Sequence, residues 1–304
     1  MSDETRPVLL AAAGAACIAF SGILVRLADV APATAAVFRC AYALPPLALL
    51  ALWERRRFGP RASGQRALAL VAGAFFAIDL ELWHHSIAAV GAGLATVLGN
   101  VQVVLVPLAA LLVLGERPHA HVFASVPVVM AGVVLISGVV GGDAYGEDPV
   151  LGVVFGVGTA VAYSVFLLVL RAGNRDLRRP AGPLFDATLA SAVAGTLIGW
   201  PLGELDLVPS WPAHGWLLAL ALSSQALGWL LISISLPRVP AALTSVVLTL
   251  QPVMAVLLAM LLLAEAPSTV QLAGVAVVLA GIVLATVGQS RRPAARSRPA
   301  PDLT

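Results

Sequence analysis

The stretch G-N-V-Q-V-V-L-V-P-L-A-A-L-L-V-L-G-E-R-P, residues 99–118, recurs in altered form as L-T-L-Q-P-V-M-A-V-L-L-A-M-L-L-L-A-E-A-P, residues 248–267. At a constant offset of 149 positions, Gln, Glu, Pro and Gly residues hold the register. Alanine, leucine and valine would match often by chance in so apolar a chain, whereas these four types would not. The matched pairs are Gln102 and Gln251, Glu116 and Glu265, Pro118 and Pro267, and Gly132 and Gly281. The chain is therefore predicted to contain an internal repeat.

The composition is that of a polytopic membrane protein. Hydrophobic residues make up 60% of the chain and charged residues 11%, and the mean hydropathy is +0.95. A soluble globular domain has about 25% charged residues. The net charge is only +2 and no basic block is present, which argues against nucleic-acid binding. Cys17 and Cys40 lie in apolar segments at no metal-like spacing, so they form no disulfide or metal framework.

Ten apolar segments are long enough to cross a bilayer, which takes about 20 residues of helix. Because the bilayer core offers no water to backbone polar groups, each crossing segment must be helical. We therefore predict an all-α polytopic membrane protein with ten transmembrane helices. The predicted spans are residues 8–28, 33–53, 67–87, 92–115, 121–139, 150–171, 183–203, 214–236, 241–264 and 268–288.

The placement of arginine supports this count. With the N-terminus inside, 16 of the 18 basic residues fall in inner segments, and only Arg26 and Arg39, which flank the first outer turn, do not. An excess of arginine marks cytoplasmic loops, so both termini are predicted to be cytoplasmic. The outer segments carry acidic residues instead, namely Asp29, Asp143, Glu147, Asp148, Glu204, Asp206 and Glu265.

The repeat divides the chain into two five-helix units, residues 8–139 and 150–288, followed by an arginine-rich tail, 289–304, that we expect to be disordered. An odd number of helices in each unit places the two units in opposite orientations. Inverted repeats are the architecture of secondary transporters, in which the substrate site lies near the membrane midplane between the repeats. The fifth and tenth helices are almost wholly apolar, with Gly and Ala, as suits outer packing helices.

The turn motifs L-G-E-R-P (114–118) and L-A-E-A-P (263–267) resemble those of the drug/metabolite transporter superfamily, in its EamA branch. Each motif precedes a helix that ends in A-G-V-V-L or A-G-I-V-L, and Arg39, which opens the second helix, also fits. The resemblance covers residues 8–288. It implies a basket of ten helices around a central cavity, lined mainly by the first, third, fourth, sixth, eighth and ninth. The segment W-H-H-S-I (83–87), followed by L-G-N (98–100), looks like that of YddG-type bacterial amino-acid exporters.

Polar residues inside spans tend to face a water-filled interior or another polar group. No catalytic group, cofactor motif or ATPase module is found, and His119 and His121 are too few to predict a metal site. Glu116 and Glu265 are interpreted as structural caps at helix starts. The residues predicted to line the cavity are Asp79, Glu81, Trp83, His84, Asn100, Gln102, Tyr163, Ser164, Gln225, Trp229, Ser245 and Gln251.

Helical phase divides the polar residues of the third span into two faces. At 100° per residue, Asp79 and Glu81 are about 200° apart and cannot share a face. Glu81, His84 and His85 form one group, and Asp79 lies with Trp83 on the other side. Which of the two faces meets the cavity stays open. His84 and His85 suit an outer-interface position as well as a proton-switch role.

These features predict a secondary transporter of the bacterial inner membrane that exports small metabolites, with amino acids favoured, by alternating access. The predicted partners are the small-molecule substrate and the lipid bilayer, and no cofactor or nucleic acid is predicted; proton coupling and the choice between monomer and homodimer stay open. The carboxylates suit an amine or a cation, so an exporter of multiple drugs or cationic compounds is the main alternative. A shortage of arginine in the predicted cavity argues against nucleotide sugars or phosphorylated cofactors. The short loops disfavour an enzyme or receptor, and the repeat disfavours a channel.

Overall fold

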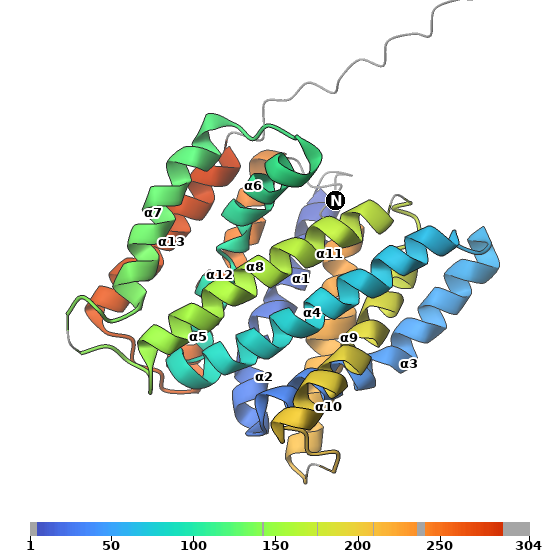
Figure 1. Ribbon diagram of the computed structural model, residues 1–304, viewed down its shortest axis with the longest axis horizontal. Helices are drawn as coiled ribbons and strands as arrows, with labels where there is room; N and C mark the ends of the chain where they lie inside the picture. The colour runs from blue at the N-terminus through green and yellow to red at the C-terminus, as the bar shows by residue number, and fades with distance from the viewer. Residues whose placement is uncertain (1–4, 142, 175, 209, 236–240, 288–304) are drawn as a thin grey trace, which may run out of the picture.

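The computed structural model describes residues 5–141, 143–174, 176–208, 210–235 and 241–287, so the predicted tail lies outside the described residues. Within these ranges every regular element is a helix (Figure 1). The helices are α1 (Thr5–Ala19), α2 (Ser21–Ala28), α3 (Pro32–Phe58), α4 (Ser63–Val90), α5 (Ala92–Gly99), α6 (Gln102–Leu114), α7 (Ala120–Ile136), α8 (Pro149–Gly173), α9 (Ala181–Leu202), α10 (Ala213–Leu220), the π-helix η1 (Ala221–Gly228), α11 (Trp229–Ser235), α12 (Ala241–Leu262) and α13 (Thr269–Val287).

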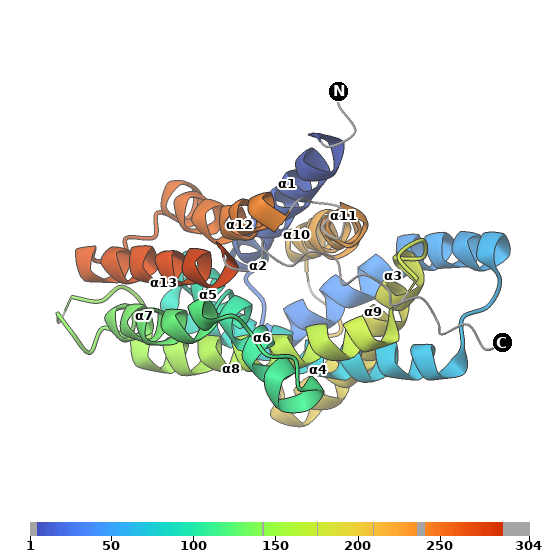
Figure 2. The ribbon, with the colours of Figure 1, turned by 90° about the horizontal axis from the view of Figure 1, so that it is seen from above.

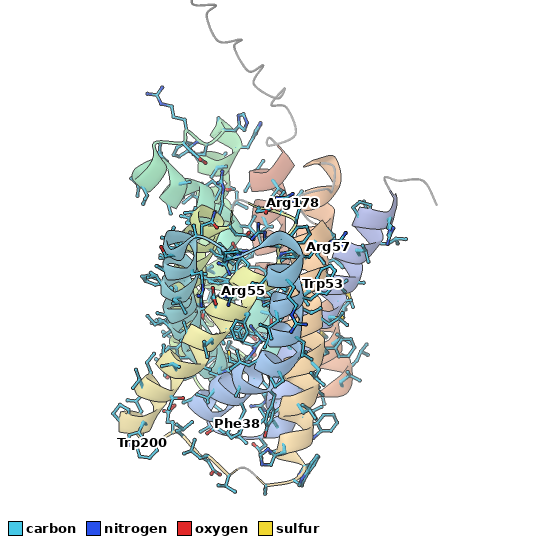
Figure 3. All side chains as sticks on the ribbon, turned by 90° about the vertical axis from the view of Figure 1, so that its right-hand side faces the viewer. Phe38, Trp53, Arg55, Arg57, Arg178 and Trp200 are labelled. Atoms are coloured by element: carbon cyan, nitrogen blue, oxygen red, sulfur yellow. The ribbon has the colours of Figure 1, made fainter. Side chains whose placement is uncertain are left out.

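Eight helical stretches among the described residues are long and apolar enough to cross a membrane, and two shorter apolar helices, Ala120–Ile136 and Thr249–Leu262, accompany them. Large apolar side chains face outward along these stretches; Leu112 is 86% exposed and Leu261 is 78% exposed. Such exposure would be unfavourable in water and is expected in lipid. Trp53 and Trp200, both exposed, lie toward opposite ends of the bundle (Figure 3), as in the aromatic belts of membrane proteins.

Three of the crossing stretches are interrupted. α1 gives way to α2 at Phe20, and α5 gives way to α6 at Asn100 and Val101. The stretch from α10 to α11 passes through the π-helix η1, a rare element that is frequent at functional sites. Interrupted helices are common near transporter binding sites, because the freed backbone groups can face a ligand.

Helix packing reflects the sequence repeat. With the offset of 149 residues, α3 corresponds to α9, α5 and α6 to α12, and α7 to α13, and each of these equivalent sets packs against its counterpart. Likewise α4 packs along α8, and the stretch equivalent to α4, formed by α10, η1 and α11, packs along α1 and α2. If each helix is replaced by its counterpart from the other half, the same set of packed helix pairs results. Figures 1 and 2 show α7 and α13 side by side at one edge, away from α3 and α9.

Small residues bring the edge pair α7 and α13 together. A Cβ atom added to Gly132 would lie 2.8 Å from the carbonyl oxygen of Gly274, and one added to Gly281 would lie 2.5 Å from the side chain of Val129. Glycine therefore allows the backbones to approach closely, which is the usual way for helices to associate where lipid removes the hydrophobic driving force. The prediction that the fifth and tenth helices are packing helices agrees with this contact.

The links between helices gather at two ends of the bundle. At the end that we name the arginine-rich end, Arg171 pairs with Glu116 at 3.4 Å, and Arg179 donates to the carbonyl of Gly59 at 3.0 Å. Figure 3 shows Arg55, Arg57 and Arg178 near this end. This end holds the links at residues 59–62 and 115–119, together with residues 174 and 176–180.

The opposite end, which we name the acidic end, holds the links at residues 29–31, 137–141, 143–148, 203–208, 210–212 and 263–268. The Thr34 hydroxyl donates to the carbonyl of Glu204 at 2.9 Å, and the backbone N–H of Asp148 donates to the carbonyl of Ala89 at 3.2 Å. α7 therefore begins at the arginine-rich end, whereas its repeat counterpart α13 begins at the acidic end. Equivalent helices run in opposite directions, as the inverted repeat requires.

Candidate functional site

Three ionisable side chains from three helices lie together inside the bundle: Arg39 of α3, Asp79 of α4 and Tyr163 of α8. We name them the central polar cluster. Arg39 is 3% exposed and Asp79 is 5% exposed, and the charges of Arg39 and Asp79 act on each other and on the Tyr163 hydroxyl. Asp79 and Tyr163 lie near the middle of their helices, so the cluster lies well away from both ends.

The charged groups of this cluster have few partners within the protein. Arg39 Nε and Nη1 are buried without a hydrogen bond, and no ion pair within 4.0 Å joins Arg39 to Asp79. The guanidinium instead lies over the ring of Trp83, 5.7 Å from its centroid, where the electron-rich face of the ring attracts it. A buried charge without hydrogen bonds is unfavourable by several kcal/mol. Nε and Nη1 of Arg39 therefore remain without a partner among the described residues.

An aromatic wall borders the central polar cluster. The rings of Phe76 and Phe166 stack with centroids 4.6 Å apart, and Trp229 of α11 packs edge-on against Phe166 at 5.5 Å. Tyr163 lies 5.6 Å from Phe166 and 5.9 Å from Trp229, so it joins the wall to the charged groups. The arrangement offers apolar surface directly beside opposite charges.

A second buried polar patch lies where η1 meets α9. The Gln225 amide donates to the hydroxyl of Thr188 at 3.3 Å, while Gln225 Oε1 and the Ser224 hydroxyl have no hydrogen bond. Both residues are fully buried. Of the predicted residues, Gln225 therefore retains a free acceptor inside the bundle, and the π-helix presents it.

The structure does not bring all the predicted residues to one place. Asn100 is held by its own helix, because its amide donates to the carbonyl of Thr96 at 2.8 Å, and the Ser164 hydroxyl donates to the carbonyl of Ala160 at 2.6 Å. Gln102 is buried at the start of α6, and Gln251 is half-buried in α12. The side chain of Ser245 lies outside the described residues.

The two faces of α4 separate as the helical phase predicts. Asp79 lies beside Arg39 and Tyr163, whereas Glu81 lies beside His85 and the link that follows α9. His84 is buried and its Nδ1 lies 3.0 Å from the carbonyl oxygen of Pro32. The Asp79 face is therefore the one that meets the central polar cluster, and the Glu81 face meets a neighbouring helix end.

Arg39 is absent from the predicted cavity residues, among which there is no arginine. Its predicted place is the opening of the second helix, beside the first outer turn. In the structure Arg39 lies two turns inside α3 and is buried. The sequence signal for a role of Arg39 is its position inside a predicted span, since a buried arginine there is energetically unfavourable unless it has a role.

Each half of the chain provides a glutamate that caps the start of a helix in the other half. Glu265 accepts hydrogen bonds from the backbone N–H groups of Ala92 at 2.6 Å and Gly93 at 3.2 Å, at the start of α5. It therefore caps a helix start, although not that of α13, which follows it. Gly91 permits this approach, because its φ of 90° suits glycine and a Cβ atom there would lie 2.8 Å from the Glu265 carboxylate.

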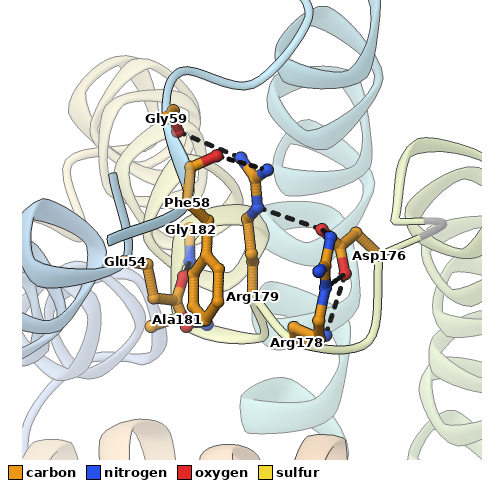
Figure 4. Close-up of polar contacts among 8 residues, drawn as sticks. All are labelled: Glu54, Phe58, Gly59, Asp176, Arg178, Arg179, Ala181 and Gly182. Atoms are coloured by element: carbon orange, nitrogen blue, oxygen red, sulfur yellow. Dashed lines mark hydrogen bonds and ion pairs between the residues drawn. The ribbon is translucent and has the colours of Figure 1, made fainter. Parts of the chain in front are cut away.

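Glu54 makes the corresponding contact at the arginine-rich end. It accepts from the backbone N–H groups of Ala181 at 2.9 Å and Gly182 at 2.7 Å, at the start of α9 (Figure 4). Beside it, Arg61 pairs with Asp186 at 2.9 Å. A cavity of about 270 Å³ opens here, between the end of α3 and the start of α9. Paired charges surround this cavity, in contrast to the central polar cluster, so we regard it as part of the structural closure of this end.

The sequence profile of the EamA-like transporter family matches residues 5–138 and, a second time, residues 150–287. The fold is similar to that of a solved structure titled "Crystal structure of protein", with a TM-score of 0.62 and 18% sequence identity, over 96% of this chain and 100% of the other. At that identity the likeness shows a shared fold alone. No curated protein matches the sequence.

Proposed function

Because this chain belongs to the EamA-like transporter family, and is therefore a multi-pass membrane transporter of the drug/metabolite transporter superfamily, we propose that it exports amino acids. The observation that carries the proposal is the central polar cluster. Arg39 and Asp79 are buried opposite charges, and Arg39 Nε and Nη1 have no hydrogen bond from the described residues. An amino acid carries a carboxylate and an ammonium group, so it can supply a partner to each.

The proposed roles follow from charge. The guanidinium of Arg39 binds the substrate carboxylate, since its planar set of donors matches a carboxylate. Asp79 binds the ammonium group, and the wall formed by Phe76, Phe166 and Trp229 contacts the substrate side chain. A cationic drug fits less well, because Arg39 repels it. A nucleotide sugar also fits less well, because Asp79 offsets the single buried arginine.

We propose that the chain crosses the membrane ten times, with both termini and the arginine-rich end in the cytoplasm of a bacterial cell. The excess of arginine at one end and of acidic residues at the other supports this orientation. The two five-helix units, residues 8–139 and 150–288, move against each other around the central polar cluster and open it to one side at a time. Asp79 is the proposed carrier if transport is coupled to protons. The protein acts as a monomer or a homodimer.

Transport by purified full-length protein in liposomes tests this function. Vesicles are loaded with one labelled amino acid at a time, and its release is compared with that of a labelled quaternary amine. Amino-acid release should saturate with concentration. Arg39→Gln and Asp79→Asn should each lower it by about 10- to 100-fold, which corresponds to the loss of one charge-assisted hydrogen bond of about 1.5–3 kcal/mol.

Arg55→Gln is the matched control, because Arg55 lies on the same helix and is exposed; its release should equal that of the unaltered protein. The double variant Arg39→Gln/Asp79→Asn removes both charges together. It therefore controls for misfolding caused by a single unpaired charge. It should fold and remain inactive. Release of the amine without release of any amino acid would refute the proposal.

A further inference from the structure

A group with metal-ligand chemistry lies at the acidic end, outside the central polar cluster. Glu81 and His85 of α4 and Glu204 of the link after α9 each offer one ligand atom, and these atoms lie within 4.8 Å of one another. We name them the acidic-end triad. Glu81 and His85 are one helical turn apart, so both point to the same side of α4. Only the fold brings Glu204 to them.

The contacts of His85 hold Nδ1 against its own helix and turn Nε2 toward Glu204, where a metal ion could bind between them. Nδ1 lies 2.9 Å from the backbone carbonyl oxygen of Glu81 and donates to it. The neutral ring then carries its lone pair on Nε2, which lies 3.4 Å from Oε1 of Glu204. Metal-binding histidines typically donate their other N–H to a carbonyl or carboxylate in this way, because that bond fixes the ring and its tautomer.

Three of the four carboxylate oxygens of the triad lack a hydrogen bond among the described residues, and the fourth, Oε1 of Glu204, faces His85 Nε2 at 3.4 Å. Glu81 is 7% exposed, and neither of its carboxylate oxygens makes a hydrogen bond; Oε2 of Glu204 is also buried without one. Two carboxylates held this close repel each other unless one takes up a proton or a cation lies between them. The unsatisfied oxygens therefore point to a positive ligand that binds at this place.

The surroundings hold the three residues in position. The Thr34 hydroxyl donates to the backbone carbonyl of Glu204 and accepts from the N–H of Asp206 at 2.8 Å, which fixes the link after α9. The ring of Phe155 packs on His85 with centroids 5.1 Å apart. The side chains of His85 and Glu204 are 26% and 32% exposed, so an ion can enter from the acidic end.

We propose that the acidic-end triad binds a divalent transition metal ion, of which Zn²⁺ fits best. One imidazole nitrogen and two carboxylate oxygens are ligands that Zn²⁺ accepts at about 2.0–2.2 Å, with a water in the fourth position. The two carboxylates neutralise the ion's charge. Mg²⁺ and Ca²⁺ fit less well, since they prefer six or more oxygen ligands. The bound ion ties α4 to the end of α9 and stabilises the closed packing of these helices.

Zinc binding by the full-length protein in detergent tests the site. The protein carries an affinity tag without histidine and the substitutions His119→Gln and His121→Gln, so that no competing histidine pair remains. After treatment with a chelator, titration calorimetry with ZnCl₂ should give one ion per chain, and the melting temperature should rise with Zn²⁺. Glu81→Gln, His85→Gln and Glu204→Gln should each weaken binding by at least about 10-fold.

Glu116→Gln is the matched control, because Glu116 is a glutamate in a link at the other end; it should bind Zn²⁺ as the unaltered protein does. Glu204→Gln is the decisive variant, because Glu204 lies in a link and its replacement leaves the helices intact. The absorption of Co²⁺ in the unaltered protein gives a readout that needs no variant, since bands of four-coordinate Co²⁺ should appear. Absence of binding by the unaltered protein, or equal binding by Glu204→Gln, overturns the proposal. A proton shared within the triad, or a protonated His85, would give that result.

Discussion

Replacement of Glu265 by alanine should lower the stability of the whole bundle, although Glu265 lies in a link. Its carboxylate is 3% exposed and is the partner of two backbone N–H groups, at 2.6 and 3.2 Å, at the start of α5. Alanine leaves both N–H groups buried without an acceptor. Each such group costs about 1–3 kcal/mol, so we expect a loss of about 2–6 kcal/mol in the free energy of unfolding.

Glu265→Gln separates the hydrogen bonds from the rest of the side chain. Glutamine keeps one acceptor oxygen and turns its amide toward the other N–H, so about half of the loss should remain. The control is Glu116→Ala at the equivalent position of the first half. Glu116 is exposed, and among the described residues it pairs with Arg171 at 3.4 Å; exposed ion pairs contribute about 0–1 kcal/mol.

Unfolding in mixed micelles with increasing SDS, followed by tryptophan fluorescence, measures these differences. The six tryptophans make the signal strong. The expected order of stability is unaltered protein and Glu116→Ala together, then Glu265→Gln, then Glu265→Ala. A loss below about 0.5 kcal/mol for Glu265→Ala would refute the reasoning, because two buried N–H groups cannot be left unpaired at so small a cost.

Three other predictions follow from local contacts. Gly73→Ala should lower the free energy of unfolding by about 1–3 kcal/mol in the same assay, because its Cβ would lie 2.2 Å from a carbonyl oxygen of α9. Gly64→Ala, with open space around it, should leave the free energy of unfolding unchanged. Glu54→Ala should resemble Glu265→Ala, since it also uncaps two buried N–H groups; stability equal to that of the unaltered protein would contradict this. Hydrogen bonds from the Arg178 side chain lower the pKa of Asp176 to about 2, so this interaction is present at neutral pH and is lost only as the pH falls through that value. Carbon-13 NMR of the Asp176 carboxyl should show no titration between pH 7 and about 4, and Arg178→Gln should return its pKa toward about 3.9.

The helix positions and the repeat could be predicted because they depend on local pattern. An apolar run of about 20 residues must form a helix in lipid wherever it lies, and the predicted spans 67–87 and 150–171 correspond to α4 and α8. Helical phase likewise separates Asp79 from Glu81 without any knowledge of their neighbours. The interruption of the eighth span by η1 was not predicted, since no proline or glycine pair in A-L-S-S-Q-A-L-G marks a π-helix.

The sequence by itself determined that this chain crosses a membrane, that its two halves are related and oppositely oriented, and which side chains share a helix face. Each of these follows from residue type and from spacing along one helix. Only the tertiary structure decided which charges meet. Arg39 comes close enough to Asp79 for their charges to act on each other. Glu265 contacts the start of α5 and Glu204 contacts His85, each across 119 or more residues of sequence. Such contacts depend on how helices pack, and packing is set by the summed fit of many small side chains rather than by any one motif.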